Sequence, residues 1–173
     1  MLGSLFRSSL PDDAVEYAGF VLMHCAAIAD SNREGELICP FAVVTDAAGR
    51  QVLDFESETQ EEAVAKGWTS LSEAKRARVW WAFGREGISR RPDGTGMDVL
   101  TVTVWVPGMR EHYSFTQRFG RGPDQGIYLI GKPEALKHGE EYAEPLERWN
   151  HAALGRGIAS HPKGSLWSEW LGP

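Results

Sequence analysis

The strongest constraint on the fold is a stretch at residues 97–119, which reads as two β-strands joined at Pro107 and Gly108. The first strand, residues 97–106, is β-branched almost throughout and lacks the 3.6-residue period of a helix. A proline followed by a glycine fits the two central positions of a type II turn. That turn is not the favoured two-residue hairpin turn, so the loop between the strands is expected to be longer.

The alternation of side chains along these two strands fixes which residues share a face. With the strands paired from the turn, we expect Val102 to face Tyr113 and Leu100 to face Phe115. The apolar side of one strand then meets the aromatic side of the other. A one-residue slip would place both rings beside threonines, whereas a two-residue shift keeps the faces and changes the partners.

The opposite face of this hairpin is polar, and it holds Thr101, Thr103, His112, Ser114, Thr116 and Arg118. One interpretation is a solvated face, because antiparallel sheets commonly leave one side to water. The other is a polar floor beneath a ligand, with His112 and Arg118 as its ionisable groups. For the second interpretation the candidate ligand-binding residues are Thr101, Thr103, His112, Ser114, Arg118 and Arg121.

The length and charge of the chain limit its number of domains and the kinds of partner it can bind. At 173 residues it should form a single domain, residues 1–173, and bury roughly 70% of its unfolded surface. We expect a loose leader at residues 1–10 and an irregular tail at 155–173 packed on the domain. The net charge of −6 and the pI near 5.4 argue against a nucleic-acid partner. The sequence also lacks a secretory signal and an apolar stretch of the roughly 20 residues that span a bilayer, so we predict a cytoplasmic protein with no membrane partner.

Standard enzyme and cofactor motifs are missing from the sequence, which has no Gly-x-Ser-x-Gly, His-Glu-x-x-His or Cys-x-x-Cys. The glycine-rich run at 120–126 leads into a predicted strand, whereas a dinucleotide or phosphate loop leads into a helix. We interpret Cys25 and Cys39 as two reduced, mostly buried thiols. The sequence therefore predicts no cofactor and no metal. A catalytic triad assembled in space leaves no such motif, so the question of catalysis stays open.

Two long helices are expected, one from residue 11 to about 29 and one from 60 to about 77. The first has no charge between Glu16 and Asp30, so it is either buried by the C-terminal segment or exposed as a contact surface. The second begins with a capping box at 59–62, and another capping box at 70–73 leaves two short helices as an alternative.

The remaining segments are mostly strands. A strand at 37–45 is followed by a turn at 46–49 and by a second strand on which Asp54, Glu56 and Glu58 form an acidic row. Such a row is usually a solvated edge, and a site for a hard cation is the alternative. Arg85 and Glu86, near the end of a strand at 78–88, read as a surface ion pair. The last elements expected are a strand at 127–130 and short helical segments at 133–141 and 145–154.

These elements follow in the order α-β-β-α-β-β-β-β-α, which implies an α+β domain. We expect a single antiparallel sheet of about six strands with the helices packed on one face. The predicted function is a non-catalytic binding module that pairs with itself as a homodimer or with another protein, since aromatic residues favour interfaces. The alternative is a small enzyme, or a protein that binds a small anion, using the polar face around His112 and Arg118.

Overall fold

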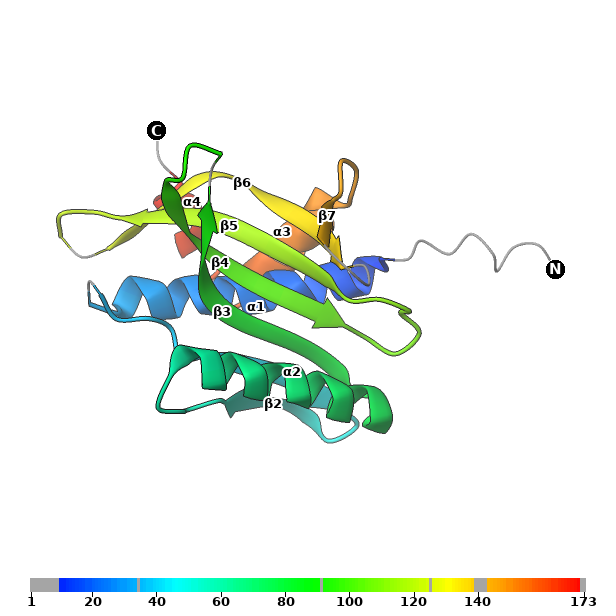
Figure 1. Cartoon of the computed structure of the whole chain (residues 1–173). Helices are drawn as coiled ribbons and strands as arrows, with labels where there is room; N and C mark the ends of the chain where they lie inside the picture. Colours follow the sequence, from blue (N-terminus) through cyan, green and yellow to red (C-terminus); the bar gives the residue numbers. More distant parts are fainter. Residues whose placement is uncertain (1–9, 34, 91, 125, 139–142, 172–173) are drawn as a thin grey trace.

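The computed structural model describes residues 10–33, 35–90, 92–124, 126–138 and 143–171. Of the leader predicted at 1–10, only Leu10 falls within these ranges, and it is buried. The elements shown in Figure 1 are α1 (Asp12–Ser31), β1 (Phe41–Asp46), β2 (Gly49–Asp54), α2 (Gln60–Ala77), β3 (Trp80–Arg90), β4 (Gly96–Trp105), β5 (Tyr113–Arg121), β6 (Ile127–His138), β7 (Ala143–Pro145), α3 (His151–Ser160) and α4 (Leu166–Trp170).

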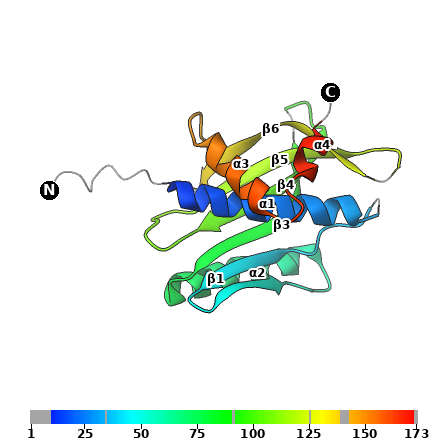
Figure 2. The ribbon, with the colours of Figure 1, turned by 180° about the vertical axis from the view of Figure 1, so that it is seen from behind.

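The strands form one open antiparallel sheet in the order β2-β1-β3-β4-β5-β6-β7. The predicted α+β class and single sheet are confirmed, with seven strands instead of six because β7 was not expected. The helices cover both faces instead of one: α1 and α3 lie on one face and α2 on the other (Figures 1 and 2). The reason lies in β3, whose Trp81 and Phe83 face α2 while Gly84 faces Cys25 of α1. A strand that is apolar on both faces has to be covered on both.

Helix α1 is sandwiched between the sheet and α3, as Figure 2 shows. The two helices approach so closely that a Cβ on Gly19 would collide with the backbone oxygen of Leu154, and one on Gly157 would collide with that of Glu16. The charge-free surface of α1 is therefore buried by the C-terminal segment. Much of the tail expected to be irregular at 155–173 is helical, because its glycines allow this close contact even though they are poor helix formers.

Strands β4 and β5 form the predicted hairpin with the predicted faces, but their register is shifted by two residues. Val102 pairs with Phe115 instead of Tyr113. The turn is where it was expected, with Gly108 at φ +98°, but residues 110–112 lie between the turn and β5 and lengthen the loop. A two-residue shift changes partners and preserves faces, which is why the core side of the hairpin was predicted correctly.

Strand β6 continues through Pro133, where a short helix and a polar loop were expected at 133–141. A β-bulge at Gln117 disturbs the pairing there. The side-chain Nε2 of Gln117 donates hydrogen bonds to the backbone oxygens of Ile130 (3.2 Å) and Gly131 (3.1 Å). Residues 131–133 have no partner in the β5 register, so Pro133 lies where its missing N–H breaks no ladder hydrogen bond. Of the predicted range 133–141, residues 139–141 lie outside the described residues.

The turn predicted at 46–49, with Asp46 facing Arg50, is displaced: the β1–β2 hairpin closes one residue earlier. Asp46 pairs with Gly49, and its Oδ1 accepts a hydrogen bond from the backbone N–H of Ala48 at 2.8 Å. This shift moves every downstream side chain to the other face. Glu56 and Glu58 lie beyond the end of β2, so the predicted acidic row does not form along the strand.

Helix α2 is continuous, which decides between the two predicted capping boxes. Thr59 Oγ1 accepts a hydrogen bond from the backbone N–H of Glu62 at 3.1 Å, so the first box caps the helix. Ser70 lies inside the helix, and its Oγ accepts a hydrogen bond from Trp81 Nε1 at 2.8 Å. No helix in the described ranges is both long enough and apolar enough to cross a membrane.

Candidate functional site

The polar face of the β4–β5 hairpin is organised by a chain of hydrogen bonds. Thr103 Oγ1 lies 2.7 Å from Ser114 Oγ, which lies 2.5 Å from His138 Nε2 of β6. The exposed fractions of Thr103 and Ser114 are only 1% and 2%. The hydroxyls therefore do not form a solvated surface; they hold the His138 ring in place.

His112 stands beside His138, just before β5 begins. Their ring centroids are 4.6 Å apart, and the centroid of Trp68 from α2 lies 5.5 Å from that of His112. Burial, followed by the charges of His138 and Lys75, lowers the pKa of His112 to about 4. Burial, followed by the charge of Arg85, also lowers the pKa of His138. Both imidazoles are consequently neutral at pH 7 and present N–H groups without a charge.

Arg85 of β3 adds a positive charge beside this array of hydroxyls and imidazoles. It pairs across the sheet with Thr101, and its charge acts on His138. Its Nε is buried without a hydrogen-bond partner, and its side chain makes no ion pair with any described residue. Burial lowers the pKa of the guanidinium. The predicted ion pair with Glu86 is wrong, because successive residues of a strand point to opposite faces. Glu86 instead accepts a hydrogen bond from the backbone N–H of Ile38 at 3.0 Å.

The structure brings most of the predicted ligand-binding residues to one face: Thr101, Thr103, His112, Ser114 and Arg118. Arg118 marks the far end of this face, where it pairs with Val99. Arg121 does not belong to it. Its Nη1 donates hydrogen bonds to the backbone oxygens of Ala29 (2.8 Å) and Asn32 (3.4 Å), so it caps the C-terminal end of α1.

Two residues of the site, His138 and Arg85, were not predicted as site residues from the sequence. His138 was assigned to a polar loop because Pro133 concealed the strand that carries it. Arg85 was assigned to the surface because the sequence did not show which face of β3 lies beside the threonines. The one usable signal for Arg85 was its position two residues after Phe83, which is on the same face of the strand.

The array includes a contact between Ser114 and His138 whose chemistry depends on access from solvent. A serine beside a histidine resembles a nucleophile and its base, but Ser114 is too deeply buried for a substrate to reach its oxygen. Among the described residues no group of three His, Cys, Asp or Glu side chains is placed to hold a metal ion. Cys25 is buried as expected, whereas Cys39 is exposed, and both are free thiols.

The face itself is open. Helix α2 covers its β2–β1–β3 end, and no helix in the described part of the chain covers the β4–β6 end (Figure 1). Trp68 stands at the boundary between the two halves, against both His112 and Phe83. A face that a helix covers only at one end suits an anionic group carried by a larger partner better than it suits an enclosed metabolite.

Comparison of the chain with models of protein families, with curated protein sequences and with solved structures found no match.

Proposed function

We propose that the chain is a cytoplasmic, non-catalytic binding module that receives an anionic group on the open half of its polar sheet face. The groups that contact the anion are Arg85, His112 and His138, with Arg118 at the far end. The buried hydroxyls of Thr103 and Ser114 hold His138 in position.

The observation that supports this proposal is the unpaired guanidinium of Arg85. A partly buried cation without a counter-ion costs stability, because desolvation disfavours the charge and nothing offsets it. A carboxylate or phosphate on the face would supply the missing counter-ion and could accept hydrogen bonds from the guanidinium fork. The two neutral histidines add N–H donors without adding further positive charge.

The proposal is tested by titrating the protein with inorganic phosphate while following the imidazole NMR signals of His112 and His138. Saturable shifts are expected, together with a rise in the pKa of His138, because a nearby anion stabilises the imidazolium. The variant Arg85→Gln should lose most of this response. Exposed Arg148, which lines a cavity with residues of α1, provides the matched control in Arg148→Gln. Equal affinity in the wild type and Arg85→Gln would refute the role of Arg85.

Homodimerisation is a second candidate function, and we propose the edge of the sheet, instead of α1, as its interface. The surface of α1 is covered by α3, whereas β2 lies at the edge of the sheet and pairs only with β1 among the described strands. An unpaired edge can add a strand from a second copy. Sedimentation velocity across micromolar concentrations tests this: a clean monomer throughout excludes the dimer, and Val52→Pro in β2 should abolish any dimer that forms through the edge.

A further inference from the structure

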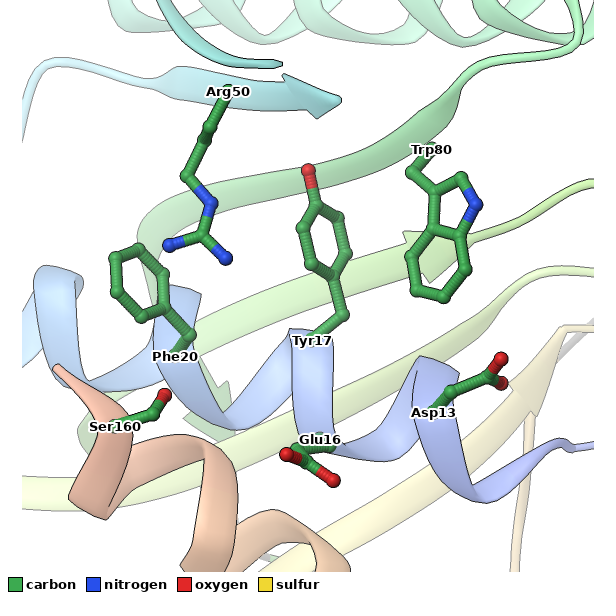
Figure 3. Close-up of a pocket in the computed structure, with 7 residues that line it drawn as sticks. All are labelled: Asp13, Glu16, Tyr17, Phe20, Arg50, Trp80 and Ser160. Atoms are coloured by element: carbon green, nitrogen blue, oxygen red, sulfur yellow. The ribbon is translucent and has the colours of Figure 1, made fainter. Parts of the chain in front are cut away.

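A concave site lies on the opposite face of the sheet, between α1, β2 and α3. It is a cavity of about 250 Å³ lined by Asp13, Glu16, Tyr17, Phe20, Arg50, Trp80 and Ser160. Figure 3 shows Arg50 reaching from β2 toward the rings of Phe20 and Tyr17, with Trp80 and Asp13 on the other side of Tyr17. The cavity therefore has a cationic end and an anionic end separated by aromatic rings.

The cationic end is built around the guanidinium of Arg50. Its Cζ lies 3.9 Å from the centroid of Phe20 and 5.9 Å from that of Tyr17. This position over the ring of Phe20 is a cation–π contact that restricts the guanidinium and leaves its N–H groups available for hydrogen bonds. Among the described residues none accepts a hydrogen bond from this side chain or forms an ion pair with it. The fork is thus oriented and open to a carboxylate.

The anionic end combines a carboxylate with an aromatic face. Asp13 is exposed and makes no ion pair with a described residue, whereas Glu16 is held by Arg156 at 3.5 Å from its Oε2. The ring of Trp80 stands edge-on to Tyr17, with the centroids 5.4 Å apart. A carboxylate beside an indole attracts a cation by charge and by the π face together.

The separation of the two ends selects the size of the ligand. Asp13 and Phe20 are seven residues apart on α1, which corresponds to about 10 Å at a rise of 1.5 Å per residue. An extended chain of three residues spans about the same length, at roughly 3.3–3.6 Å per residue. The α-ammonium and α-carboxylate groups of a free amino acid are too close together to reach both ends.

We propose that this groove binds the carboxyl-terminal end of a peptide. The terminal carboxylate lies on the guanidinium of Arg50, and a basic side chain two residues earlier lies between Trp80 and Asp13. The intervening residues run over the ring of Tyr17, whose hydroxyl is occupied by the backbone oxygen of Val43 (3.0 Å) and does not compete for the ligand. This site is independent of the anion site on the other face.

The test uses an N-acetylated tripeptide of arginine, alanine and alanine with a free carboxyl group, titrated into labelled protein while the indole N–H signal of Trp80 is followed. Saturable shifts are expected, and amidation of the peptide should weaken binding at least tenfold, because the guanidinium then faces a neutral group. A tripeptide whose carboxylate belongs to a glutamate side chain, with an amidated end, distinguishes the two sources of a carboxylate. If it binds as tightly as the free carboxyl terminus, the terminus is not what the groove recognises.

Two matched pairs of variants locate the ligand. Arg50→Gln and Asp13→Asn should each reduce affinity about tenfold or more, while Arg148→Gln and Asp12→Asn should not, since Arg148 and Asp12 line a different cavity. Circular dichroism confirms that the variants fold. Absence of binding to the wild type, or equal binding to Arg50→Gln, overturns the proposal. Neither outcome bears on the phosphate titration at the opposite face.

Discussion

The lowered pKa of His112 makes the stability of the fold depend on pH in a way that one substitution can isolate. The unfolded chain protonates His112 near pH 6.5, whereas the folded protein does so near pH 4. Below pH 6.5 the unfolded state therefore binds more protons, and folding stability falls until the pH passes below the pKa of the folded state. Above pH 6.5 the ring is neutral in both states and contributes no pH dependence.

The magnitude follows from the size of the pKa change. A fall from 6.5 to about 4 corresponds to about 3 kcal/mol if the whole change is felt, at about 1.4 kcal/mol per tenfold change. The ring is only half-buried, so solvent screening reduces the expected loss between pH 7 and pH 4 to about 1–2 kcal/mol. Lys75 opposes protonation and Glu111 favours it, and both act on the same ring.

The assay is urea unfolding at pH 7 and pH 4 for the wild type and His112→Gln. His24, His138 and His161 also have lowered pKa values, so the wild type loses more stability than His112 alone accounts for. The difference between the two proteins isolates His112: the variant should lose about 1–2 kcal/mol less on acidification. Identical pH dependence in both proteins, or an NMR titration that places His112 near 6.5, would refute the reasoning.

Three further predictions concern residues whose neighbours are defined. Gly157→Ala should destabilise the fold by about 3 kcal/mol or more in chemical denaturation, because the added Cβ meets the backbone of α1. Gly155→Ala in the same helix has open space around it, so it should be neutral or stabilise the fold by up to about 1 kcal/mol. Arg121→Gln should lower the free energy of unfolding by about 1 kcal/mol and increase hydrogen exchange at the end of α1, an effect that an equivalent change at exposed Arg76 should not produce. Arg85→Gln should leave the free protein as stable as the wild type or more stable while it removes phosphate binding, and a large loss of stability would show that the guanidinium has a structural role.

What could be predicted from the sequence depended on whether the pattern was local. The alternation of Leu100 and Val102 with the threonines gave the faces of the hairpin, because a face depends only on strand geometry. The partners depended on how the chain leaves the turn, and residues 110–112 carry no signal that decides it. The same limit applied to the side of the sheet on which α2 packs, since the stripe of a helix shows that it is buried without showing which face of the sheet covers it.

The candidate site was partly predictable for the same reason. Residues on the hairpin itself, such as Thr103 and Ser114, were placed together correctly because they are close in sequence. His138 and Arg85 join them from strands on either side, and only the order of strands in the sheet brings them there. Their residue types gave no indication of a site. An arginine before a glutamate is ordinary at a surface, and a histidine a few residues beyond a proline is ordinary in a loop.

Arg85 and Arg50 present the same physical problem on opposite faces of the sheet. In a chain with a net charge of −6, counter-ions are plentiful, yet neither guanidinium has an ion-pair partner among the described residues. A solvated arginine needs none, but Arg85 is partly desolvated and the guanidinium of Arg50 lies over the ring of Phe20. Packing therefore restricts both side chains in positions where the folded chain gains no ion pair from them. An arginine that is fixed and left unpaired keeps its hydrogen-bonding capacity for a group outside the chain, and this is the property that both proposed sites require.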